Sequence, residues 1–544
     1  MHRSARRWTW AVAASVAAAV AVLGFGVASS SGTTPKGAAS GASAAQPLVI
    51  DAATPPSTLD PAESCPVTDF GPVGNMYVSL TQFGTSTKNG VTLGNPNKIV
   101  PYLATKWKSS DSYHTWTFTL RSGVKFPNGD PLNGAAVKFT YERLVSMGGC
   151  ASGEPTGEAP GKGLIKSIDT PNATTVVFHL SIPISQFPSY QTNPGDLGIV
   201  DPSLVSANGG VQAGKVNTWI ASHDAGSGPY VLKSYTPGVQ MVLTRNPRYF
   251  GRAPLRNTIK INFITSDSTL LLDAENGSAD VTEGLSASSF ASLKGKTAVK
   301  LISFPIGFYE FVSFPNKSAP FNNVRFREAL TYAVPYKQIQ SKVVYGYGAL
   351  FYGPFPPGFV GYNASLSKPR TLDLSRAKAL IKQSGVKIPI TLTQPIYVLS
   401  GDFDGLQVAT VVQSTWAQLG ITVKIDQVSS TQYAGTNFGL HKTWLIVGND
   451  GPDVPTPFYL GNYDERCTSA YNRANYCNPQ VDSLLVKSES ARGPAQQAIW
   501  NQIQKLWVAD SPRIPLYQMY KTVAAKPGIK YGYTPDQYIY SKTG

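Results

Sequence analysis

Two stretches in the first half of the chain alternate apolar and polar residues, which is the pattern of half-buried β-strands. Residues Trp116–Arg121 alternate ahead of the turn Asn128-Gly129, and Thr175–Leu180 alternate in the same way. Because successive side chains of a strand point to opposite faces, each stretch predicts a strand with one buried face. We therefore expect a β-rich region of hairpins between about residues 95 and 222.

Further along, the apolar spacing becomes that of amphipathic helices, each followed by a strand. One helix begins after Asp373 as a cap and ends at Gly385, and Ile388–Leu392 then alternates as a strand. The next helix ends at Gly420 and is followed by a strand at 421–425. Its apolar residues are Val408, Val412, Trp416 and Leu419. The last helix precedes Pro512 and the strand Ile514–Tyr517. Its apolar residues are Ile499, Ile503, Leu506 and Trp507. Helix and strand in alternation predict an α/β layer domain.

The N-terminus has the three parts of a secretory signal. Arg3, Arg6 and Arg7 precede the uncharged stretch Trp8–Ala28, whose last residues are small. We expect residues 1–28 to be a signal peptide, with retention as an anchor helix as the alternative, since about 20 apolar residues can span a bilayer. Residues 29–46 are rich in Ser, Gly, Ala and Thr, which predicts a flexible linker.

Charge and composition narrow the function classes. The chain has 544 residues, of which 42% are hydrophobic and 15% charged, which excludes a disordered chain or a coiled coil. Four positive charges of the net +15 lie at or before Lys36, which leaves +11 for the body. Export would keep this body away from nucleic acid, so the charge suggests an anionic envelope, or a neutral or acidic ligand.

The four cysteines suit disulfides better than a metal. Cys467 and Cys477 bracket a loop rich in Tyr, Asn and Arg, and Cys65 and Cys150 would form the remaining pair, although spacing leaves the pairing open. The sequence has no C-x-x-C motif, and four of its histidines are scattered: His114, His179, His223 and His441. We predict no metal site.

Enzyme motifs are missing, whereas aromatic residues are abundant. The chain lacks G-x-S-x-G, H-E-x-x-H, a Walker A loop and a dinucleotide fingerprint. Two acid pairs, Asp402/Asp404 and Asp450/Asp453, could serve acid–base chemistry but are usually turn or cap residues. With 27 Tyr, 23 Phe and 9 Trp, a cleft that closes on a ligand is favoured over a secreted hydrolase.

A series of motifs, in order, resembles one known family. The matching segments are Thr58–Pro61, Pro101–Ala104 with Trp116–Gly129, Gly228–Tyr230 with Arg245–Tyr249, Val324–Leu330, and Tyr476–Asp482. They cover nearly all of residues 48–520 and resemble the extracytoplasmic solute-binding proteins of peptide-type ABC importers, solute-binding protein family 5. The resemblance implies a monomeric receptor that partners a membrane permease, with no cofactor and no enzymatic activity.

The family fold implies two α/β lobes of the periplasmic-binding-protein type II class, joined by a hinge and carrying an extra β-rich domain. On this basis we expect lobe I at 47–94, 226–310 and 512–544, the inserted β-rich domain at 95–225, and lobe II at 311–511. The helix–strand alternation found above falls within the expected lobe II.

The resemblance also implies a ligand segment. In peptide-binding relatives an Asp pairs with the peptide ammonium group, and the matching positions here are Asp450 first and Asp453 second. The preceding backbone would bind an extended peptide as an added strand, and the other expected contacts are Trp444, Val447, Gly448 and Tyr77.

The segment also departs from the family pattern. Gly451 replaces an aromatic residue and Val454 replaces a proline in the ligand segment, while Ala136 and Val78-Ser79 depart elsewhere. These changes keep other solutes open, namely oligosaccharides or metal chelates. A secreted hydrolase and an adhesin that binds anionic wall polymers are the alternatives from other classes.

Overall fold

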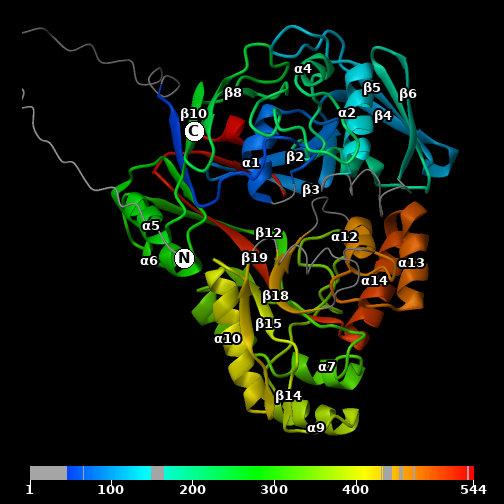
Figure 1. The fold of residues 1–544 in the computed structure, drawn as a ribbon, viewed down its shortest axis with the longest axis vertical. Helices are drawn as coiled ribbons and strands as arrows, with labels where there is room; N and C mark the ends of the chain where they lie inside the picture. The colour runs from blue at the N-terminus through cyan, green and yellow to red at the C-terminus, as the bar shows by residue number, and fades with distance from the viewer. Residues whose placement is uncertain are drawn as a thin grey trace, which may run out of the picture. The chain divides into compact units, whose positions relative to one another are not determined.

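The computed structural model describes residues 46–64, 67–148, 164–429, 432, 444–451, 457–469, 472–535 and 538–544 (Figure 1). The predicted signal segment 1–28, Cys65, Cys150 and Asp453 lie outside these residues. Within the described part, no helix combines the length and apolar composition that crossing a bilayer requires.

One mixed sheet runs through both lobes of the fold. Among the described residues it has 11 strands, and β13 (Gly348–Ala349) lies off its main path. Across the sheet the strands follow in this order: β17 (Ile425–Val428), β15 (Ile396–Leu399), β18 (Leu445–Asp450), β12 (Lys300–Ser313), β19 (Arg513–Ala525), β11 (Val281–Glu283), β1 (Leu48–Ala52), β10 (Thr258–Phe263), β9 (Gln240–Arg245) and β8 (Tyr230–Thr236). The predicted two-lobed α/β fold is confirmed.

Strands β12 and β19 run from one lobe into the other and are hydrogen-bonded along most of their length. Their register shifts between Pro305 and Tyr309 and again between Glu310 and Phe311. At the first shift, the Gln518 amide donates to the carbonyl oxygen of Ile306 at 2.8 Å. A bulge in a paired strand bends it locally, so we take this interruption as the hinge.

Lobe II packs helices α7 (Val324–Thr331), α9 (Leu374–Ser384) and α10 (Phe403–Ala417) around its strands. The predicted boundaries of α9 are confirmed, because Asp373 accepts a hydrogen bond from the backbone N–H of Arg376 and Gly385 adopts a φ of 74°. The predicted helix through Val408 and Trp416 is α10. Its apolar face shares one core cluster with β15 and β18, a cluster that contains Val408, Val412, Trp416, Ile396, Val398, Leu445 and Val447.

Two predicted strands of lobe II differ from the structure. The strand expected at 388–392 is limited to β14 (Ile390–Thr391), and the one expected at 421–425 divides into two. Its first part, β16 (Ile421–Thr422), pairs with β14, whereas β17 pairs with β15 in the large sheet. Both parts turn apolar residues toward the same core, so the alternation continues across a change of partner.

Lobe I is built on β1, β8–β11 and the paired parts of β12 and β19. Helices α1 (Val67–Met76), α5 (Asp267–Asn276) and α6 (Ala287–Ser292) belong to it. Its core includes Leu48, Ile50, Met76, Tyr77, Ile259 and Ile261. This core draws on all three segments expected for lobe I and also on Val200, Val205 and Ile220, so the expected lobe boundaries stay a prediction.

The β-rich region forms a sheet of its own, in the order β4 (Ala104–Ser110), β5 (Thr115–Leu120), β7 (Thr175–Leu180) and β6 (Ile165–Asn172). The two alternating stretches are thus confirmed as β5 and β7. The expectation of hairpins alone missed the helix α2 (Gly134–Met147), and a short helix, α4 (Pro202–Ala207), follows the sheet. Rings of Phe118, Phe178 and Phe187 meet edge-on in its core.

The expected boundary at residue 95 falls inside a strand. Strand β3 (Val91–Pro101) pairs with β2 (Thr81–Lys88) and with β20 (Tyr531–Tyr533), close to the C-terminus. This three-stranded sheet connects lobe I to the β-rich region, so the insertion has no clean edge at this position.

A buried ion pair joins the family-like segment Thr58–Pro61 to the β-rich region. Asp60 is fully buried, and Arg143 on α2 is 2% exposed. The Nη1 of Arg143 donates to Oδ1 of Asp60 at 2.9 Å. The motif therefore supplies the counter-charge that lets an arginine pack inside the protein.

Three helices, α12 (Pro457–Asp464), α13 (Pro479–Ser490) and α14 (Gly493–Asp510), follow β18. The predicted last helix is confirmed as α14, and the apolar strand after it extends to the 13 residues of β19. A disulfide joins Cys467 and Cys477, so this predicted pair is confirmed. Side chains from these helices and from the β-rich region share one core cluster.

Candidate ligand-binding site

The carboxyl ends of the lobe II strands lie next to the hinge. Strands β15, β17 and β18 are parallel, and β18 ends at Asp450 beside Tyr309 of β12. In open α/β sheets, ligands bind at the carboxyl edge of the strands. We therefore place the candidate site at this edge.

Strand β18 is paired on one side along its length and on the other only at its start. On the side of β12 the pairing extends from Ile446 to Asp450, whereas on the side of β15 it covers Leu445 and Ile446. Among the described residues, no strand pairs with the end of β18 on that second side. An extended ligand could add there as a further strand.

The predicted contacts on β18 take different positions. Val447 is fully buried in the lobe II core, so it can offer a ligand only its backbone. Gly448 lies opposite Phe311 of β12. Trp444, just before the strand, is half-buried, and its ring centroid lies 4.0 Å from that of Tyr397.

Asp450 is already paired with a cation. Its Oδ2 lies 2.7 Å from Nη1 of Arg473, and its Oδ1 accepts a hydrogen bond from the N–H of Gly451. Burial raises the pKa of Asp450, whereas Arg473 opposes the rise. Because Arg473 compensates this carboxylate, Asp450 does not present a free charge to a ligand ammonium group.

Arg513 organises a buried network on the same face of the sheet. Its guanidinium donates to the Tyr309 hydroxyl at 3.0 Å, to Oδ2 of Asp464 at 3.2 Å and to Oε1 of Glu465 at 2.8 Å. Burial raises the pKa of Glu465 to about 7, even though Arg513 lowers it. The sequence analysis missed Arg473 and Arg513, and no local motif marks residues whose partners lie dozens of positions away.

The opposite face of β12 and β18 is acidic. Glu310 of β12 lies opposite Asn449 of β18, and it is 3% exposed. Its side chain interacts with Asp402 and Asp404, which stand at the start of α10. Burial raises the pKa of Asp404 to about 6, and Asp402 adds to this rise. The sequence marked these two aspartates as a pair but not Glu310.

Comparisons with known proteins identify the family. The profile of the bacterial extracellular solute-binding proteins, family 5 (middle), matches residues 98–467. A protein of Escherichia coli (strain K12) named "Probable D,D-dipeptide-binding periplasmic protein DdpA" is 30% identical over 487 residues, which are 89% of this chain and 90% of that protein. The chain belongs to this family.

Other relatives of this family 5 protein share its length and fold. The "Di/tripeptide-binding protein 2" of Pseudomonas aeruginosa (strain UCBPP-PA14) is 26% identical, with 88% of this chain and 91% of that protein covered. The structure of DppA from Helicobacter pylori in complex with the peptide STSA superposes with a TM-score of 0.77 at 22% identity, over 92% of this chain and 97% of that one.

Tyr77 lies inside lobe I in this family 5 protein. Its ring is fully buried in the lobe I core, and its hydroxyl accepts a hydrogen bond from the N–H of Ala225 at 3.3 Å. Close contacts with Gly198 and Gly226 surround it. Tyr77 therefore packs in the core of lobe I, and its contact with a ligand stays a prediction.

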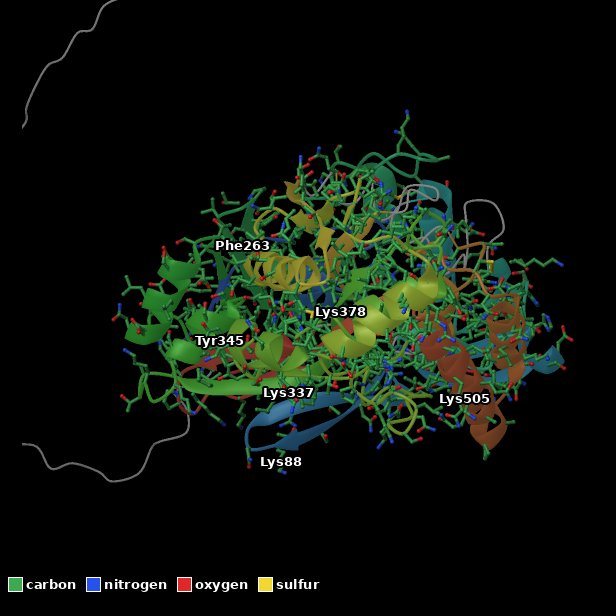
Figure 2. All side chains as sticks on the ribbon, turned by 90° about the horizontal axis from the view of Figure 1, so that it is seen from below. Lys88, Phe263, Lys337, Tyr345, Lys378 and Lys505 are labelled. Carbon is green, nitrogen blue, oxygen red and sulfur yellow. A yellow bond between two sulfur atoms is a disulfide. The ribbon has the colours of Figure 1, made fainter. Side chains whose placement is uncertain are left out.

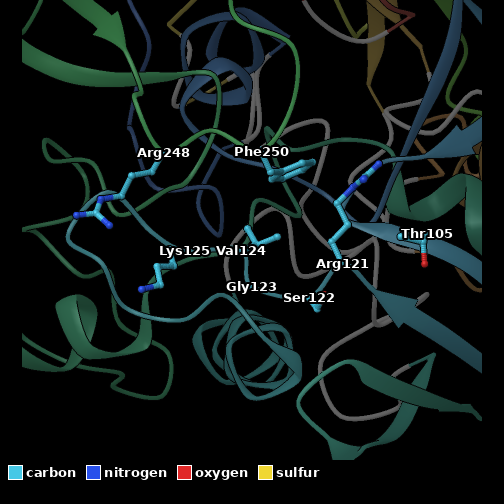
Figure 3. A pocket seen from close by; sticks show the side chains of 8 residues that line it. All are labelled: Thr105, Arg121, Ser122, Gly123, Val124, Lys125, Arg248 and Phe250. Carbon is cyan, nitrogen blue, oxygen red and sulfur yellow. The ribbon is translucent and has the colours of Figure 1, made fainter.

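A basic pocket lies elsewhere, in the β-rich region and the loop after β9. It has a volume of about 520 Å³, and its lining includes Arg121, Lys125, Arg248 and Phe250. Figure 3 shows Lys125 and Arg248 on one side and Arg121 on the other. The Arg121 guanidinium carbon lies 5.2 Å from the Phe250 ring centroid. None of the lining residues belongs to the lobe II strands.

The remaining positive charge is spread over many elements. Lys88, Lys337, Lys378 and Lys505 come from four separate parts of the chain, are exposed, and lie spread across the view in Figure 2. Among the described residues, no group of three or more His, Cys, Asp or Glu side chains has an arrangement that could hold a metal ion.

Proposed function

We propose that this family 5 protein is the peptide receptor of an ABC importer. It captures short peptides outside the cytoplasm and delivers them to a membrane-embedded permease, as a monomer and without chemistry of its own. Two relatives are named for binding dipeptides or di- and tripeptides, and this chain aligns with 90% and 91% of their lengths. Their names support a peptide ligand. The observation that carries the proposal is the second edge of β18, which no described strand pairs beyond Ile446, at the carboxyl end of the lobe II strands.

Binding at this edge would couple to movement of the lobes. A peptide that adds to β18 also contacts lobe I across the hinge, so its binding free energy favours the arrangement in which both lobes touch it. The hinge strands remain paired outside the bulge near Ile306, which confines the bending to a short segment. The permease would then recognise the liganded arrangement.

Asp450 has a structural task in this proposal. It neutralises Arg473 and fixes the end of β18, while the neighbouring backbone of Gly448 and Asn449 meets the peptide.

A binding screen on the purified full chain tests the proposal. The probes are L-dipeptides, L-tripeptides, D-Ala-D-Ala, cello- and malto-oligosaccharides and nickel chelates, with thermal shift first and calorimetry on the hits. We expect at least one peptide to raise the melting temperature and to bind with one-to-one stoichiometry. A sugar or chelate that binds while every peptide fails would refute a peptide receptor, and turnover of any probe would refute a pure binding protein.

A further inference from the structure

The basic pocket in the β-rich region is built from three separate segments of the chain. Strand β4 supplies Thr105, the turn after β5 supplies residues 121–125, and the loop after β9 supplies Arg248 and Phe250. Its volume of about 520 Å³ falls within the usual range for sites that hold small organic molecules, about 300–1,000 Å³. The pocket shares no residue with the lobe II strands, so a ligand bound here would occupy a second site.

The cations that line this pocket have no counter-charge. Among the described residues, no Asp or Glu forms an ion pair with Arg121, Lys125 or Arg248. Asp130, the acid that follows Lys125 most closely, instead accepts a hydrogen bond from the Asn128 amide at 2.9 Å. Uncompensated positive charge in a concave place raises the local concentration of anions.

The loop after β9 adds to this charge along a longer stretch. It lies within residues 225–266, which contain no Asp or Glu but six Lys or Arg. In Figure 3, the side chains of Lys125 and Arg248 extend in the same direction although they come from different segments. Like charges that share a pocket repel each other, and an anion between them would remove that cost.

Packing holds two of the cations in place. Nε of Arg121 donates to the carbonyl oxygen of Tyr102 at 2.7 Å, and its guanidinium carbon stacks over the Phe250 ring at 5.2 Å. The Nη groups of Arg121 donate to no described acceptor. Nη1 of Arg248 lies 3.8 Å from the position that a Cβ would take at Gly129, so it rests against the backbone of the turn. The pocket therefore offers donors whose positions are partly set before a ligand arrives.

These donors suit a phosphate group. A guanidinium presents paired N–H donors that match two phosphate oxygens, and a lysine adds a compact point charge. A phosphate also has more acceptor oxygens than a carboxylate, which suits three cations around one pocket. Gly123, in the lining turn, has a φ of 71° and no atom within 4 Å of where its Cβ would stand, which leaves room for a ligand. The Phe250 ring offers an apolar face to the carbon atoms of an ester.

We propose that the basic pocket binds the phosphate group of a phosphate ester, either a small soluble ester or the headgroup of an anionic phospholipid. Arg121, Lys125 and Arg248 hold the phosphate, and Phe250 contacts the carbon atoms next to it. The inference does not rest on the proposed peptide function, because the pocket lies apart from the edge of β18.

Calorimetry on the full chain tests the pocket. The probe is sn-glycerol 3-phosphate, with glycerol as the uncharged reference at equal ionic strength, and the variant is Lys125→Gln/Arg248→Gln. We expect the wild type to bind the ester but not glycerol, and the variant to lose affinity by about 10-fold or more, because two charge-assisted hydrogen bonds are removed. Both side chains are exposed, so the melting temperature of the variant should match that of the wild type.

A matched control separates the pocket from net charge. Lys337→Gln/Lys378→Gln removes two exposed positive charges from lobe II and leaves the pocket intact. This control should bind glycerol 3-phosphate as the wild type does. An equal loss of affinity in both variants would show that the anion responds to total charge, and the inference would be overturned.

Vesicle sedimentation distinguishes the two sources of phosphate. Phosphatidylglycerol vesicles are compared with phosphatidylcholine vesicles, and every variant keeps the same N-terminal segment. Binding to phosphatidylglycerol that the pocket variant loses and the lobe II control keeps would support a lipid headgroup, whereas binding of glycerol 3-phosphate alone would support a soluble ester. If the wild type binds no glycerol 3-phosphate and both variants sediment as it does, the inference fails, and the peptide screen decides the proposed function independently.

Discussion

Replacing Arg513 by methionine should destabilise the protein in a manner that depends strongly on pH. The arginine is 1% exposed and donates to Asp464, Glu465 and Tyr309. Methionine fills part of the volume but leaves two carboxylates buried without their cation. Breaking a buried ion pair by removing one partner costs about 3–5 kcal/mol, and we expect a loss in this range at about pH 8.

The pH dependence follows from Glu465. Its pKa in the folded wild type is about 7, above the usual value of 4.5, so the folded state binds more protons than the unfolded state between these values. Stability therefore falls as the pH rises through this window. Without Arg513 the folded pKa rises further, which makes the fall steeper and extends it to higher pH. At about pH 5 the Glu465 carboxyl is neutral in the folded variant, so the part of the penalty that comes from Glu465 is absent.

Urea unfolding followed by circular dichroism at about pH 5 and about pH 8 measures both effects. The double variant Arg513→Met/Glu465→Gln should regain about 1–2 kcal/mol of unfolding free energy at the higher pH, because one of the two uncompensated carboxylates has been removed. A loss that is equal at both pH values, or that the second substitution leaves unchanged, would refute this account of the network.

Three further predictions concern stability. Replacing Cys467 and Cys477 by serine opens a loop of ten-residue separation and should cost about 2–3 kcal/mol in chemical denaturation, whereas the wild type in reductant should match the variant. Asp60→Asn leaves Arg143 buried and uncompensated, so we expect a loss of about 3 kcal/mol, visible as a lower melting temperature. Asp404→Asn should do the opposite: the folded pKa of about 6 means that Asp404 reduces stability as the pH rises from 3.8 to 6. Removing that charge should raise the free energy of unfolding by about 1–2 kcal/mol at neutral pH and flatten its pH profile.

The fold was largely predictable wherever periodicity and caps agree. Asp373 and Gly385 bracket α9 as expected, and the alternation of Thr175–Leu180 matches β7 residue for residue. These signals are local, because a cap bonds within its own first turn and a strand shows its buried face every second residue. The change of partner strand between Ile421 and Ile425 is not local, and spacing does not reveal it.

The site was predictable only in part, because charge compensation depends on distant residues. The pattern around Asp450 points to the end of strand β18, but the partner of Asp450, Arg473, lies in a loop that the alternation does not describe. Glu310 stands in an apolar stretch of β12, where one acid carries no motif. Tyr77 followed the family pattern and proved to be a core residue, because motif positions serve packing as well as binding.

The position of β19 has a consequence for how the chain assembles. This strand comes from residues 513–525 and lies between β12 and β11, in the middle of the large sheet. Until those residues are made, the strands on either side have no partner at the centre, and neither lobe can close its sheet. Contacts between residues so far apart in the sequence form slowly, since a long loop must close first. A nascent chain therefore emerges from the ribosome with its central strand still missing, and the large sheet is completed only after residues 513–525 have been made.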